Sequence, residues 1–120
     1  MIEKLIGTMF LSREVAHREH LKTNSYAKHE ALGGFYDCVI GLADGLAEAY
    51  QGRNGVIDDI PILSNDRPNS DIIKTLEYHL AVIEKTRYKA IEEKDTALHS
   101  LVDDIVNLYL STLYKLRQLR

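Results

Sequence analysis

The sequence has 120 residues, of which 45% are hydrophobic, so it predicts one globular domain over residues 1–120 and argues against a disordered chain. Its formal net charge of −3 disfavours nonspecific nucleic-acid binding, and its one cysteine excludes an internal disulfide framework. No apolar run approaches the roughly 20 residues of a membrane span. The start also lacks the long apolar core of a signal peptide, so we expect a cytoplasmic protein.

Apolar residues recur at helical spacing through most of the chain, and no segment shows the alternation of a strand. The first helix is predicted over about residues 2–22. Asn24 or Ser25 can cap a second helix over about residues 26–51, because short polar side chains accept hydrogen bonds from the first turn of a helix. The following connection, over residues 51–70, holds both prolines and is longer than two antiparallel neighbours need.

The connection is therefore expected to cross the end of a bundle, with VIDDIPIL forming a short turn against the bundle or a partner. The third helix is predicted to start near Asn69 or Ser70 and to end before EEKDT. Asp95 or Thr96 can cap the fourth helix. The predicted fold class is all-α, a four-helix bundle with a long crossover between the second and third helices.

Glycines interrupt the predicted second helix at positions 33, 34 and 41. Each glycine costs about 1 kcal/mol relative to alanine in a helix interior. Because the flanking apolar pattern is strong, we interpret Gly33, Gly34 and Gly41 as sites of close approach by another helix.

Histidines and carboxylates form the candidate site. Asp44 and Glu48 are four residues apart and share a helix face, and Asp37 lies on the same stripe. His29 precedes Asp44 by fifteen residues, roughly 22 Å along a helix, so one metal ion cannot touch both within one chain. Surface placement of His17 and His29, with carboxylates facing water, is the alternative interpretation.

A two-fold axis would bring the two ends together. If two copies of the second helix pack antiparallel and cross near Cys38, His29 of one subunit approaches Asp44 and Glu48 of the other. His17 can join from the same helical corner. Mixed imidazole and carboxylate ligands suit Fe(II), Mn(II) or Zn(II), so the sequence predicts two equivalent metal sites in a homodimer.

The spacing of His17, His29, Asp44 and Glu48 resembles that of the mini-ferritins called Dps, DNA-binding proteins from starved cells. In that family a histidine ends the first helix, a second follows twelve residues later, and an acidic pair follows fifteen and nineteen residues after that. SYAKHEAL, DGLAEAYQG and DTALHSLVDDIVNLYLSTLYKL are also similar to family segments. The likeness covers most of the chain, and its specific part is residues 10–52.

The resemblance implies a ferritin-like subunit of a closed shell of twelve. Such a shell binds Fe(II) at shared interface sites, oxidises it with peroxide or oxygen, and stores or detoxifies the iron as ferric mineral. By this likeness His17 and His29 are ligands from one subunit. Asp44 is a ligand from its partner, and Glu48 bridges or binds the principal iron.

The sequence departs from the family pattern at several points. Gly33 stands where the family usually has an aspartate, with Asp37 as a candidate substitute one turn later, and Arg18 stands where a tryptophan commonly follows the first histidine. The connection is shorter than usual. The Lys-rich tail that many members use on DNA is absent, so DNA binding is not expected. These departures motivate an alternative: an oligomeric binding module without ferroxidase activity, for a small ligand or protein partner.

The remaining residues of note carry no partner pattern. His20, His79 and His99 are expected at the surface. Cys38 is expected to be a small packing residue near the two-fold axis. A purely structural helical protein is the third hypothesis.

Overall fold

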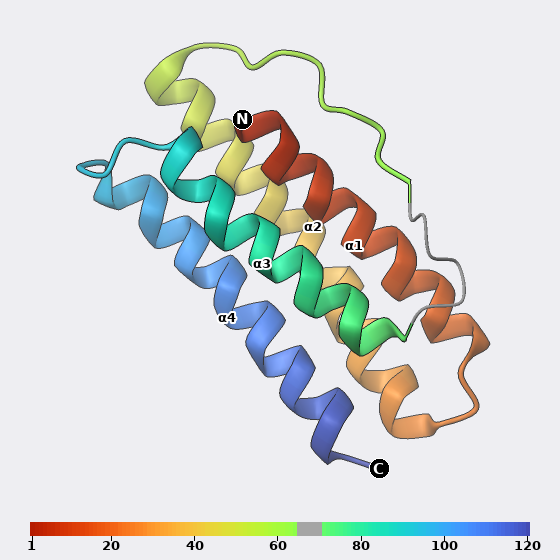
Figure 1. Ribbon diagram of the computed structural model, residues 1–120. Coiled ribbons are helices and arrows are strands. Elements are labelled where there is room, and N and C mark those ends of the chain that lie inside the picture. Colours follow the sequence, from red (N-terminus) through yellow and green to blue (C-terminus); the bar gives the residue numbers. More distant parts are fainter. Residues whose placement is uncertain (65–70) are drawn as a thin grey trace.

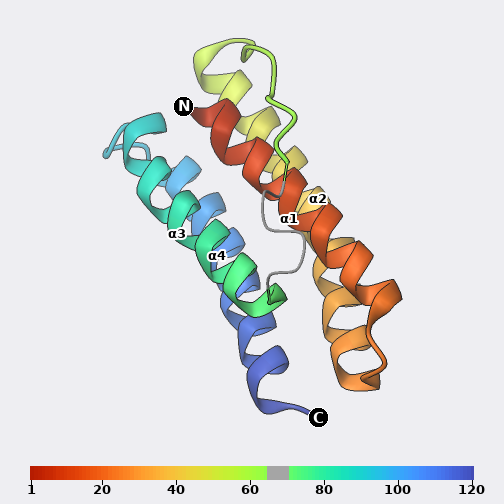
Figure 2. The same ribbon diagram turned by 45° about the vertical axis from the view of Figure 1, so that its right-hand side comes forward.

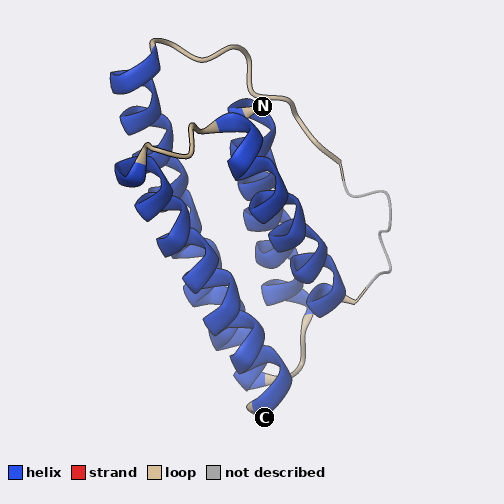
Figure 3. Cartoon of the chain, turned by 60° about the vertical axis from the view of Figure 1, so that its left-hand side comes forward, coloured by secondary structure: helices blue, strands red, loops and turns tan. Residues whose placement is uncertain are grey.

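Four helices make up the fold of this chain (Figure 1). The computed structural model describes residues 1–64 and 71–120. The helices are α1 (Ile2–Lys22), α2 (Tyr26–Asn54), α3 (Ile72–Ala90) and α4 (Thr96–Gln118). Within the described ranges there is no strand (Figure 3), and the molecule measures 44 × 25 × 21 Å. The predicted all-α four-helix bundle is confirmed.

The helices pack as two antiparallel pairs, α1 with α2 and α3 with α4, which Figure 2 shows as two layers. Across the layers α1 contacts α3 and α2 contacts α4, which leaves α1 and α4 on one diagonal and α2 and α3 on the other. The helices α2 and α3 run in the same direction, opposite to α1 and α4 (Figure 1). Residues 55–64 therefore leave α2 beside the start of α1 and run along the outside of α1.

The helix starts follow the predicted capping residues. Side chains of Ser25, Asp71 and Asp95 accept hydrogen bonds from backbone N–H groups in the first turns of α2, α3 and α4, at 3.3, 2.8 and 3.2 Å. Ser25 and Asp95 were among the predicted caps. The predicted start of α3 at Asn69 or Ser70 lies outside the described residues.

The second helix continues past the predicted residue 51 to Asn54. Gly55 ends it with a φ of 89°, in the left-handed region that favours glycine. Its N–H donates to the carbonyl oxygen of Gln51 at 2.9 Å, which closes the last turn.

The segment after α2 lies against α1 without forming the predicted short turn. Ile57 and Ile60 pack against the core, which confirms the predicted apolar contact with the bundle. A Cβ at Gly7 would lie 3.1 Å from the Pro61 oxygen and 3.3 Å from its Cγ, so a glycine at this point lets the segment approach α1.

None of the helices in the described part of the chain combines the length and the apolar character that a bilayer span requires.

A polar network lies inside the core and joins three helices. Tyr109 donates its hydroxyl hydrogen bond to Ser12 Oγ at 2.6 Å, and Ser12 Oγ lies 2.7 Å from His79 Nδ1. Phe35 of α2 packs edge-on against the Tyr109 ring, with centroids 4.9 Å apart. Burial raises the pKa of Tyr109 and lowers the pKa of His79 to about 4.

The surface position predicted for His79 is wrong, because its side chain is only 5% exposed. His79 lies three residues after Leu76 and four before Ile83, both fully buried, so it belongs to the apolar stripe of α3. The hydrogen bond between Ser12 Oγ and His79 Nδ1 compensates for the burial of the imidazole.

Candidate functional site

An aromatic cluster forms where α1 ends and α2 begins. We name His17, His20, His29 and Tyr36 the imidazole cluster; all four side chains are half-buried. The rings of His20 and His29 stack with centroids 3.7 Å apart and planes 17° from parallel. The His17 ring stacks on Tyr36 at 4.2 Å, and Tyr36 meets His20 edge-on at 5.2 Å. The cluster therefore fixes the orientation of both histidines that were predicted as ligands.

Reciprocal hydrogen bonds hold the His20–His29 pair. His20 Nδ1 lies 2.6 Å from the carbonyl oxygen of His29, and His29 Nδ1 lies 2.8 Å from the carbonyl oxygen of His20. A carbonyl oxygen can only accept, so each Nδ1 carries a proton. In the neutral rings Nε2 then keeps its lone pair, as in a metal-ligating histidine that donates its other N–H to a backbone carbonyl.

The surface position predicted for His20 is wrong, because its ring lies against α2. Helical periodicity within α1 could not reveal this contact, since the partner lies on the next helix. Gly33 provides the space: a Cβ there would lie 3.1 Å from His20 Cε1 and 3.3 Å from His20 Nδ1. The predicted close approach is confirmed at Gly33, and the approaching group is an imidazole of α1.

The predicted carboxylates lie elsewhere, on the outward face of α2. Asp37, Asp44 and Glu48 are exposed, as expected from their shared helix face. Between them the same face carries small side chains. We name as the outer face of α2 the exposed residues Gly34, Asp37, Cys38, Gly41, Asp44, Gly45, Glu48, Ala49 and Gly52.

Open space lies beyond the glycines of the outer face in the described part of the chain. An added Cβ at Gly34, Gly41 or Gly45 would have no neighbour within 4 Å. The close helix expected at Gly34 and Gly41 is therefore not supplied by the described part of this chain. Within residues 1–64 and 71–120, no three His, Cys, Asp or Glu side chains lie together so as to hold a metal ion. One subunit thus gathers the imidazoles without bringing them to the carboxylates.

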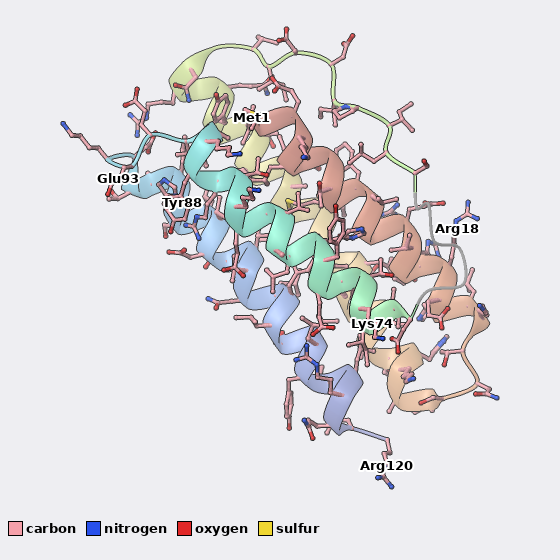
Figure 4. All side chains as sticks on the ribbon, in the orientation of Figure 1. Met1, Arg18, Lys74, Tyr88, Glu93 and Arg120 are labelled. Carbon is pink, nitrogen blue, oxygen red and sulfur yellow. The ribbon has the colours of Figure 1, made fainter. Side chains whose placement is uncertain are left out.

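Arg18, which follows His17 in the sequence, stays outside the imidazole cluster. It projects from α1 into solvent (Figure 4) and pairs with Glu14 at 2.9 Å. The two residues also line a cavity of about 420 Å³ between α1, Leu63 and the start of α3. The charges in this cavity neutralise one another, because Lys22 lies 3.9 Å from Glu19.

A buried cation, Arg87, joins α3 to α4. Arg87 is only 7% exposed and donates to His99 Nδ1 at 3.2 Å and to Asp103 at 2.8 Å. His99 is half-buried under this contact, so its predicted surface position is wrong. Because a guanidinium always donates, His99 Nδ1 accepts, and the histidine serves here as a structural partner of Arg87.

The comparisons with known proteins identify a family. No curated protein and no solved structure matches this chain. Residues 20–116 match a family of unknown function (DUF5856), and the matched range contains His20, His29, Asp44 and Glu48. Since the match spans most of the chain, the protein belongs to this family of unknown function.

Proposed function

We propose that the protein is a Dps-like iron-binding protein that oxidises Fe(II) at a site shared by two subunits and stores or detoxifies the iron. The observation that carries the proposal is the fixed Nδ1–H of His29, which leaves Nε2 as a free lone pair at the edge of α2. Stacking of His17 on Tyr36 orients the second predicted imidazole.

The helix directions support a ferritin-like fold. Because α2 and α3 run in the same direction, the chain between them must join opposite ends of the bundle (Figure 1). One long connection of this kind is typical of ferritin-like bundles, whereas simple up-and-down bundles have only short loops. The resemblance of residues 10–52 to Dps proteins extends the proposal to a subunit that assembles into a shell of twelve.

The outer face of α2 supports a homodimer. Glycine in an exposed helix interior costs about 1 kcal/mol relative to alanine, and this face holds several. A second α2 packed antiparallel across these small residues would give the glycines a function. If the two helices cross near Cys38, His29 meets Asp44 of the partner subunit and Glu48 of the partner subunit.

The donors of such a site fit iron as a substrate. Neutral imidazole and carboxylate oxygen together suit Fe(II), and Mn(II) or Zn(II) are alternatives for the same ligands. Each Fe(II) gives up one electron, which peroxide or dioxygen accepts. The carboxylates of Asp44 and Glu48 would stabilise the higher charge of the Fe(III) product, with Asp37 as a further exposed carboxylate on the same face.

Aerobic Fe(II) addition tests the function. We expect fast growth of the ferric absorbance band with the wild-type protein and a rate no greater than buffer with His29→Ala or Asp44→Ala. Asp104→Ala removes an equally exposed carboxylate from α4 and is expected to keep the wild-type rate. Undiminished oxidation by both His29→Ala and Asp44→Ala would show that iron is oxidised elsewhere.

Disulfide formation between two copies of Cys38 tests the proposed dimer. Cys38 is exposed at the proposed crossing point, so mild oxidation should link two subunits through a Cys38–Cys38 disulfide. Gly41→Leu is expected to suppress the linkage, because its side chain has free space within the chain but none in a close helix pair. If light scattering shows a dimer but oxidation forms no Cys38–Cys38 disulfide, the two-fold axis does not pass near Cys38.

An oligomeric binding module without ferroxidase activity is the second candidate. One observation favours it: the His20 ring fills the space beside Gly33, the position at which Dps proteins usually carry a carboxylate. A site richer in imidazole and poorer in carboxylate stabilises Fe(III) less. Under this alternative the dimer persists, and the ferric absorbance after Fe(II) addition grows no faster than in buffer.

A further inference from the structure

We propose that His20 is a positioning residue that holds His29 in the tautomer and orientation needed to bind a metal ion. The identity of the ion and the choice of His29 as its ligand rest on the proposed function. The control of the His29 tautomer by His20 rests only on contacts within one chain.

The first argument is the reciprocity of the two hydrogen bonds. The His20 side chain binds the backbone of His29 at 2.6 Å, and the His29 side chain binds the backbone of His20 at 2.8 Å. Each bond holds the two helix ends at the separation that the other bond requires. Removing the His20 imidazole therefore frees the two helix ends to move apart. The His20 carbonyl oxygen then no longer stays in place to accept the hydrogen bond from His29 Nδ1.

The second argument is that the pair supplies only one imidazole to a given ion. The planes lie 17° from parallel and the centroids 3.7 Å apart. The Nε2 lone pairs therefore lie in two nearly parallel planes and do not converge on one point. The pair would supply one imidazole to a given ion, that of His29, with His20 as a stacked support.

The third argument is the space beside Gly33. The His20 ring lies against this glycine, where any side chain would press on Cε1 and Nδ1. The next residue, Gly34, is also in α2 but has open space around it. Gly33 and Gly34 therefore form a matched pair, in which only the first is required for the position of His20.

The test compares His20→Ala with His20→Asn in the full chain. An asparagine amide nitrogen can replace Nδ1 as the donor to the His29 carbonyl but offers nothing in place of Nε2. With Co²⁺ as the probe, we expect His20→Ala to weaken binding by about 10- to 100-fold, as loss of an outer partner does. His20→Asn is expected to retain most of the wild-type affinity.

A second readout needs no metal. Nitrogen NMR of the imidazole of His29 should report the Nδ1–H tautomer in the wild-type protein, in His20→Asn and in Gly34→Ala. His20→Ala and Gly33→Ala should give a mixture of tautomers.

Two results would overturn the inference. One is an unchanged His29 tautomer in both His20→Ala and Gly33→Ala. The other is a loss of Co²⁺ binding in His20→Asn as large as in His20→Ala, which would make His20 a ligand. If the wild-type protein binds no Co²⁺, the proposed function fails, and the NMR comparison still decides the role of His20.

Discussion

Replacement of Ser12 by alanine is expected to lower the free energy of unfolding by about 3 kcal/mol, because it leaves two buried polar groups without partners. Ser12 Oγ is the shared partner of the Tyr109 hydroxyl and of His79 Nδ1, at 2.6 and 2.7 Å. All three side chains are buried, so water cannot readily replace the lost bonds.

Urea unfolding followed by circular dichroism measures this effect, with Tyr109→Phe as the matched control. That variant removes only the outer donor and leaves the pairing of Ser12 with His79 intact, so a loss of about 1 kcal/mol is expected. Equal stabilities of Ser12→Ala and Tyr109→Phe would show that the network is not organised around Ser12.

Acidification is expected to destabilise the bundle through His79. Burial lowers the pKa of His79 from 6.5 to about 4, so between these pH values the unfolded chain binds a proton that the folded chain does not. Stability from this group is complete above pH 6.5 and falls by about 1.4 kcal/mol per pH unit as the pH decreases. The total loss by pH 4 is about 2 to 3 kcal/mol, and below that pH the contribution levels off.

The measurement is the free energy of unfolding of the wild-type protein and of His79→Asn from pH 7 to pH 4. Asparagine can still pair with Ser12 but does not titrate, so the difference between the two proteins isolates His79 from the other histidines and the carboxylates. We expect the free energy of unfolding of His79→Asn to rise relative to that of the wild-type protein as the pH falls. Parallel curves would mean that His79 titrates normally in the folded protein.

The helices could be predicted from the sequence because their signals are local. Apolar spacing located all four, and Ser25 and Asp95 cap α2 and α4 as their side-chain chemistry suggests. The end of α2 was predicted a few residues too early, because the helix continues to Asn54 and ends at Gly55, the glycine with positive φ. The surface position predicted for His79 was wrong, although its spacing to Leu76 and Ile83 could have indicated burial.

The arrangement of the candidate site was only partly predictable. The shared face of Asp44 and Glu48 follows from their spacing of four residues, and both side chains are exposed. The pairing of His20 with His29 depends on how α1 docks on α2, and helical periodicity carries no information about that contact. The proposed pairing of two outer faces would depend on contacts with a second chain, which the apolar periodicity of one chain does not report.

Subunit complementation tests the central claim most directly. His29→Ala and Asp44→Ala each remove one half of both sites in a homodimer, whereas a mixed dimer keeps one complete site. Random co-assembly should therefore restore about a quarter of the wild-type Fe(II) oxidation rate from two inactive parents. A co-assembled sample with mixed dimers verified by mass spectrometry, yet as inactive as its parents, would contradict a site built from imidazoles of one subunit and carboxylates of the other.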